Sequence, residues 1–102
     1  ASPVYHNSYS GVLKNALDLL GSEQFERKPV GLMAHRGVQP LDHLRLVVRS
    51  LRGVAINQQI VTRDEDFERT NGSFHLTSPR IQHRLERFAE ELLDYARRFS
   101  DD

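Results

Sequence analysis

Apolar residues recur at helical spacing between residues 11 and 20, with polar residues on the opposite face. The apolar set is Val12, Leu13, Ala16, Leu17 and Leu20, and the polar set is Lys14, Asn15 and Asp18. Ser8 or Ser10 is placed to cap the first turn, and Gly21 stands where a left-handed closing residue is wanted. The pattern predicts an amphipathic helix over residues 11–20.

Two more stripes of this kind follow along the chain. Pro40 suits a first helical position, and the stripe after it stops at Gly53. Ser78 and Pro79 open the longest stripe, which keeps a 3.6-residue period almost to the C-terminus. The apolar members are Leu41, Leu44, Val47, Val48 and Leu51 in the first stripe, and Ile81, Leu85, Phe88, Leu92, Ala96 and Phe99 in the second. Both stripes predict amphipathic helices.

The segments between the helices have a different pattern. Residues 29–34 form a short run without polar alternation, which is typical of a strand covered on both faces. Residues 54–62 are rich in β-branched side chains, but the polar residues 57–59 interrupt them, so we expect the second half of this strand to leave the sheet edge. Residues 64–73 are acidic, contain Asn71-Gly72 and have little periodicity, which predicts a loop.

The order loop, helix, strand, helix, strand, helix predicts an α/β fold with parallel strands and right-handed crossovers. A chain of 102 residues with 38% apolar content allows one domain. Two strands give three amphipathic helices too little sheet to cover, because doubly wound sheets carry helices on both faces. We therefore expect part of the sheet to be missing and the chain, which begins at Ala1, to be cut from a longer protein.

Charge and composition narrow the range of functions. Fourteen basic residues balance fourteen acidic ones, so we expect no nucleic-acid partner. No apolar run approaches the roughly 20 residues that cross a bilayer, and the chain lacks cysteine, which fits a cytoplasmic protein without a membrane partner. The five histidines have no partners at a convincing ligand spacing, so no metal site is predicted. P-loop, dinucleotide and Gly-x-Ser-x-Gly motifs are also absent.

The N-terminal segment carries a family resemblance. It reads Ser2-Pro3-Val4-Tyr5-His6-Asn7-Ser8-Tyr9-Ser10-Gly11-Val12-Leu13-Lys14-Asn15-Ala16-Leu17-Asp18. This resembles the pattern Pro-x-Tyr, a few polar residues, then Gly-x-Leu-Lys-x-x-Leu/Ile-Asp that follows the third strand of NADPH-dependent FMN reductases, a flavodoxin-like family. Residues 28–34 and the helix with Leu41, Asp42, Leu44, Arg45 and Leu51 also look like their family counterparts, and agreement weakens from Gln58 onward.

The resemblance implies a fold and a domain boundary. Residues 1–102 are expected to be the C-terminal half of a flavodoxin-like doubly wound parallel sheet, in one domain. The N-terminal strands, and the Ser-, Thr- and Arg-rich loop that cradles the flavin phosphate in this family, are expected to be absent.

The resemblance also implies FMN and NADPH as cofactors and names two loops of the flavin pocket. The expected cofactor-binding residues are Pro3, Val4, Tyr5, His6, Asn7 and Ser8 in the first loop, and His35, Arg36 and Gly37 in the second, on the nicotinamide side. From the residues alone, a turn that leads into a helix is the favoured interpretation of the first loop, and the extended match to the family reverses that preference. In the second loop the family often has two adjacent glycines, whereas this chain has only Gly37. The bulkier His35 and Arg36 could reach the phosphates of the pyridine nucleotide, since an arginine fork suits that task, or could obstruct the flavin face.

The expected activity is transfer of a hydride from NADPH through bound FMN to free flavin, a quinone or an azo compound. The cofactor carries this chemistry, so no catalytic side chain is predicted. Tyr9 resembles a tyrosine of the subset that supplies reduced flavin to sulfonate monooxygenases, or it is a packing aromatic at a subunit contact. The alternative is a non-catalytic fragment or half-domain that acts by association with its missing half or with itself. The parent protein is expected to be an enzyme and a homo-oligomer, and this chain alone to be inactive.

Overall fold

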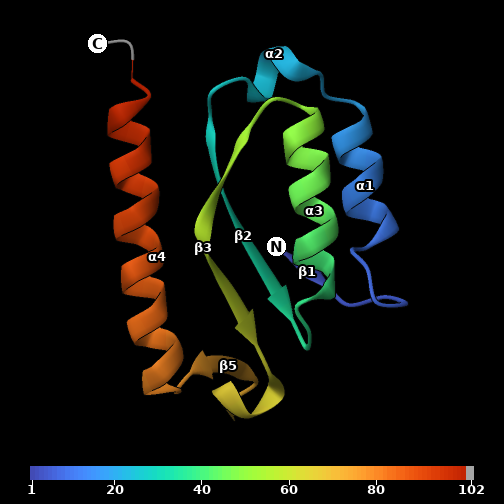
Figure 1. The fold of residues 1–102 in the computed structure, drawn as a ribbon. Helices are drawn as coiled ribbons and strands as arrows, with labels where there is room; N and C mark the ends of the chain where they lie inside the picture. Colours follow the sequence, from blue (N-terminus) through green and yellow to red (C-terminus); the bar gives the residue numbers. More distant parts are fainter. Residues whose placement is uncertain (101–102) are drawn as a thin grey trace.

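The computed structural model describes residues 1–100, in which strands and helices alternate (Figure 1). The elements are β1 (Ser2–Pro3), α1 (Gly11–Asp18), α2 (Ser22–Phe25), β2 (Pro29–His35), α3 (Gln39–Ser50), β3 (Val54–Thr62), a 3₁₀ turn (Asp64–Asp66), β4 (Phe67–Thr70), β5 (Ser73–Leu76) and α4 (Pro79–Arg98). Within the described part, β1, β2 and β3 form a parallel sheet in that order, and β4 and β5 form a separate antiparallel hairpin.

Helices cover both faces of the parallel sheet, as a doubly wound fold requires. Figure 1 shows α1 and α3 on one side of the sheet and α4 on the other. The core accordingly has two parts. The first consists of Leu32, Ala34, Leu41, Leu44 and Val48, and the second consists of Ile56, Ile60, Ile81 and Phe88. No helix within residues 1–100 is both long enough and apolar enough to cross a membrane.

The helix ends follow the predictions in part. The Leu13 amide donates to Ser10 Oγ at 3.2 Å, so Ser10 is the cap of α1. The prediction for Gly21 is wrong: α1 ends at Asp18, and Gly21 has φ −114°, which is ordinary extended backbone. Gly21 instead precedes the first turn of the short helix α2, where its amide donates to Gln24 Oε1 at 2.7 Å.

The strands are more extensive than the sequence pattern predicts. Ser2 and Pro3, expected in a loop, pair with Ala34 and His35 at the end of β2. The prediction that the second half of β3 leaves the sheet is also wrong, because pairing with β2 continues to Thr62.

The predicted loop at residues 64–73 is a further correction. Residues 67–76 form the hairpin β4–β5, turned by Asn71 and Gly72 at φ 51° and 79°. Two successive left-handed residues make the type I′ turn that joins tight hairpins, and Asn-Gly is its preferred pair. Asp66 joins this hairpin to the start of α4, since its backbone carbonyl accepts from the amides of Thr77 at 2.9 Å and Ser78 at 3.3 Å.

Candidate functional site

The carboxyl ends of the three parallel strands meet at one edge of the sheet, the usual place for a ligand in an open α/β sheet. Pro3 at the end of β1 pairs with His35 at the end of β2, and His35 pairs with Thr62 at the end of β3. The loops that leave these strands therefore lie next to one another. Both loops that are expected to contact the flavin leave the sheet at these strand ends.

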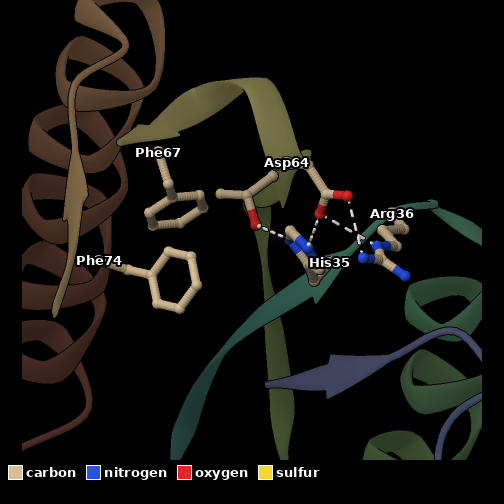
Figure 2. A pocket seen from close by; sticks show the side chains of 6 residues that line it. His35, Arg36, Asp64, Phe67 and Phe74 are labelled. Atoms are coloured by element: carbon tan, nitrogen blue, oxygen red, sulfur yellow. Dashed lines mark hydrogen bonds and ion pairs between the residues drawn. The ribbon is translucent and has the colours of Figure 1, made fainter. Parts of the chain in front are cut away.

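A pocket of about 670 Å³ opens beside the ends of β2 and β3. Its lining residues are His35, Arg36, Thr62, Asp64, Phe67 and Phe74. Figure 2 shows the two phenylalanine rings, which come from the hairpin, on one side and the group of His35, Arg36 and Asp64 on the other. The pocket thus combines an aromatic wall with a wall that can form hydrogen bonds, a combination suited to a planar polar ligand.

The polar wall is a connected network across two loops. His35 Nδ1 lies 2.9 Å from Thr62 Oγ1, and His35 Nε2 lies 2.9 Å from Asp64 Oδ1. An ionised carboxylate only accepts hydrogen bonds, so Nε2 carries a proton, and in neutral His35 the Nδ1 atom accepts from the Thr62 hydroxyl. The network fixes both the orientation and the tautomer of the ring.

Arg36 completes the network by binding the same carboxylate. Its Nε donates to Asp64 Oδ1 at 3.1 Å and its Nη2 donates to Asp64 Oδ2 at 2.9 Å. The Arg36 guanidinium, and to a lesser extent His35, hold the pKa of Asp64 below its usual value. Both Arg36 and Asp64 side chains are 67% exposed, so this is a solvated pair that an anionic ligand can reach.

Arg36 also has an unusual backbone conformation. Its φ of 76° lies in the left-handed region that favours glycine, and its amide donates to the Thr62 carbonyl at 2.7 Å. A glycine would adopt this backbone conformation without strain. A Cβ at Gly37 would lie 2.5 Å from Gln39 Oε1 and 3.1 Å from Val4 Cγ2, so a larger residue would need the exposed Gln39 side chain to turn away and Val4 to shift slightly.

The loop after β1 is a tight turn in its own right. Tyr5 and Ser8 exchange two backbone hydrogen bonds of 2.9 Å, and His6 and Asn7 between them have φ 49° and 62°. Ser8 Oγ lies 2.7 Å from Nδ1 of His43 in α3, which anchors the turn. Nothing within residues 1–100 bonds to the amides of His6 and Asn7.

Tyr9, next to this turn, is a packing aromatic in the chain. Its ring meets that of His43 edge-on, with 6.3 Å between the ring centres, and it packs against the first core cluster. Tyr9 thus has a packing role within this chain.

The structure brings some of the predicted site residues together and separates others. His35 and Arg36 line the pocket, Gly37 abuts Val4, and Pro3 pairs with His35. The other four residues of the first loop, Tyr5, His6, Asn7 and Ser8, form the neighbouring turn and do not line the pocket.

Four residues of the pocket were missed by the sequence analysis: Thr62, Asp64, Phe67 and Phe74. Thr62 and Asp64 come at the carboxyl end of β3, a position that itself signals a site in this class of fold. Phe67 and Phe74 lie on either side of Asn71-Gly72, the preferred pair of a tight hairpin turn. This pair is the sequence signal that could have placed both phenylalanines in a hairpin. Within the described residues, no group of three His, Asp or Glu side chains is arranged to hold a metal ion.

Comparison with known proteins gives consistent relatives. A model of the NADPH-dependent FMN reductase family matches residues 1–68. The FMN-dependent NADPH-azoreductase of Staphylococcus saprophyticus is 45% identical over 94% of this chain and 54% of its own length, and that of Staphylococcus aureus is 44% identical over 92% and 53%. A solved oxidoreductase from Corynebacterium diphtheriae superposes with a TM-score of 0.74 at 26% identity, covering 92% of this chain and 51% of the other.

These relatives confirm the predicted α/β, flavodoxin-like fold class. FMN and NADPH, the predicted cofactors, are the ones in the names of the family and of the two azoreductases. The chain spans about half the length of the relatives it matches.

Proposed function

Since the chain belongs to the NADPH-dependent FMN reductase family, we propose that it forms part of an FMN-dependent oxidoreductase that takes a hydride from NADPH. The electron acceptor would be free flavin, a quinone or an azo compound, the last by analogy with the two azoreductases. One observation carries the proposal: the two loops that resemble the flavin-edge loops of the family leave adjacent strand ends, beside a pocket of about 670 Å³.

The residues of the first loop fit the polar edge of a flavin ring. The turn is preformed by its two internal hydrogen bonds and its anchor on His43, so little conformational entropy is lost when a ligand binds. The amides of His6 and Asn7 remain as donors, and Tyr5 is 58% exposed beside them. Bound FMN would supply the hydride-transfer chemistry, and these residues would orient its ring.

The second loop and the pocket fit the nicotinamide nucleotide. His35 is held in one orientation by Thr62 and Asp64, and Phe74, 71% exposed, offers an aromatic face to a planar ring. Arg36 would exchange its bond to Asp64 for a nucleotide phosphate, because its planar fork suits either anion. An enzyme fed by NADPH would work in the cytoplasm, and it would be a homo-oligomer as the resemblance implies.

A second candidate function is a non-catalytic half-domain that pairs with a complementary half or with another copy. An apolar cavity of about 270 Å³ between the sheet and α4 favours it, together with the position of the two-residue strand β1 at the edge of the described sheet. The cavity is bordered by Ser2, Met33 and Ile81 among others, and burial of such a face stabilises an association.

The two functions are distinguished by adding FMN to the purified parent protein and recording its visible absorption and its consumption of NADPH. If the parent protein is an FMN-dependent oxidoreductase, we expect bound flavin and FMN-dependent oxidation of NADPH. Arg36→Gln should raise KM for NADPH, whereas Arg80→Gln, an exposed arginine at the start of α4, should not. A protein that stays colourless with added FMN and whose copies associate would favour the half-domain.

A further inference from the structure

The register between β2 and β3 changes partway along the two strands. Pro29 and Val30 pair with Val54 and Ala55, but pairing resumes with Leu32 opposite Gln59. Gly31 alone therefore stands opposite residues 56–58, so β3 contains two extra residues in a bulge. If the first register continued, Ile60 and not Thr62 would stand opposite His35.

The amides of the bulge are bound by a side chain from α4. Glu91 Oε1 accepts from the amide of Asn57 at 2.8 Å and from that of Gln58 at 3.2 Å. Gly31 allows this close approach, since a Cβ on Gly31 would lie 2.3 Å from the Phe88 ring one turn before Glu91. One carboxylate oxygen thus replaces the ladder partners that the bulge removes.

The carbonyls of the same bulge are bound by a side chain from the opposite face of the sheet. Arg45 of α3 donates through Nη2 to the Ile56 carbonyl at 3.0 Å and to the Asn57 carbonyl at 3.3 Å. The same guanidinium holds the Gln59 side chain, with Nη2 2.9 Å from Gln59 Oε1. Two half-buried charged side chains from different helices therefore satisfy both kinds of backbone group.

We propose that Arg45 and Glu91 are positioning residues for the site at the strand ends. By holding the bulge they stabilise the register that places Thr62 opposite His35, and so keep Asp64 within reach of Arg36. In the other register, Asn57, Gln58 and Gln59 would stand opposite Leu32, Met33 and Ala34, in the places of Gln59, Ile60 and Val61. The apolar core therefore also favours the observed register, and Arg45 and Glu91 add to it by satisfying the bulge that this register requires. The consequence for catalysis rests on the proposed function, whereas the effect on register does not.

The register can be measured directly by NMR contacts between strands and by exchange of the Arg36 amide, which bonds to the Thr62 carbonyl at 2.7 Å. In Glu91→Ala we expect contacts between His35 and Thr62 to weaken and exchange of the Arg36 amide to accelerate about tenfold or more, because the end of β3 is held less firmly. Glu91→Gln keeps the accepting oxygen and should retain the register, and Glu90→Ala on the exposed side of α4 is the matched control. An unchanged register in Glu91→Ala, or equal loss in Glu91→Gln, would overturn the proposal.

A second variant keeps the proposal testable if Glu91→Ala does not fold. Deletion of Asn57 and Gln58 removes the bulge and leaves a regular ladder in which Thr62 still stands opposite His35. Adding Glu91→Ala to this deletion should leave exchange of the Arg36 amide within about twofold. Accelerated exchange in the combined variant would show that Glu91 acts on stability alone and would refute a role in register. Flavin binding by the unmodified protein tests the proposed function separately.

Discussion

Gly31→Ala tests how tightly α4 is packed on the sheet. The added Cβ would lie 2.3 Å from Phe88 Cζ and 3.0 Å from two further ring carbons, so the ring or the strand must move. Phe88 is only 6% exposed and belongs to the cluster with Ile56, Ile60 and Ile81, which leaves the ring little room to turn away. Overpacking of this kind destabilises by about 1–3 kcal/mol, while alanine regains about 0.5–1 kcal/mol over glycine in a strand.

The net expectation is a loss of roughly 0.5–2 kcal/mol in the free energy of unfolding, or a Tm lower by about 4–8 °C per kcal/mol. Urea unfolding of the four chains of a double-mutant cycle, with Gly31→Ala and Phe88→Leu alone and together, measures it. Phe88→Leu makes room for the new methyl group, so the double variant should be more stable than the sum of the single losses by about 1 kcal/mol. Additive losses, or a Gly31→Ala variant as stable as the parent, would refute the packing argument.

Three further predictions concern the edge of the sheet. Asp66→Ala removes the carboxylate that accepts from the Arg63 amide at 2.7 Å, and should lower the free energy of unfolding by about 1–2 kcal/mol in urea titrations, because a buried capping acceptor is lost. The pKa of Asp64 is lowered, so its ion pair with Arg36 should persist at neutral pH and be lost as the pH falls through that lowered pKa. In Arg36→Gln, NMR of the carboxyl group should show the pKa of Asp64 rise toward its usual value. An unchanged titration of Asp64 would contradict the pairing. Phe74→Leu should leave stability within about 0.5 kcal/mol, because the ring is exposed, yet weaken nucleotide binding about two- to tenfold in calorimetric titrations.

The sequence predicts the elements that have long periodic patterns. The helices α1, α3 and α4 and the strand β2 lie where their apolar stripes place them, because burial against the sheet dictates those spacings. The family resemblance in the first two thirds of the chain agrees with the matched residues 1–68. Elements whose burial leaves a periodic pattern in the sequence are therefore predictable from one sequence.

The missed features depend on contacts that the local pattern does not encode. Residues 57–59 look like the polar end of a strand, but their polarity belongs to a bulge whose backbone is satisfied by Arg45 and Glu91, far away in the chain. The hairpin β4–β5 has strands of four residues each, too short for a periodic signal, although Asn71-Gly72 marked its turn. The pairing of Arg36 with Asp64 likewise depends on the register of β3.

The central claim is that the loops after β1 and β2 form the edge of a flavin site, and an FMN titration followed by amide NMR of the intact protein tests it most directly. We expect the amides of residues 4–8 and 35–37 to shift with a common saturation curve, led by His6 and Asn7, whose amides have no partner within residues 1–100. The last turn of α4, around Arg98, should not respond. Saturable shifts elsewhere that leave both loops unchanged, or no shift at all with FMN in excess, would contradict the account.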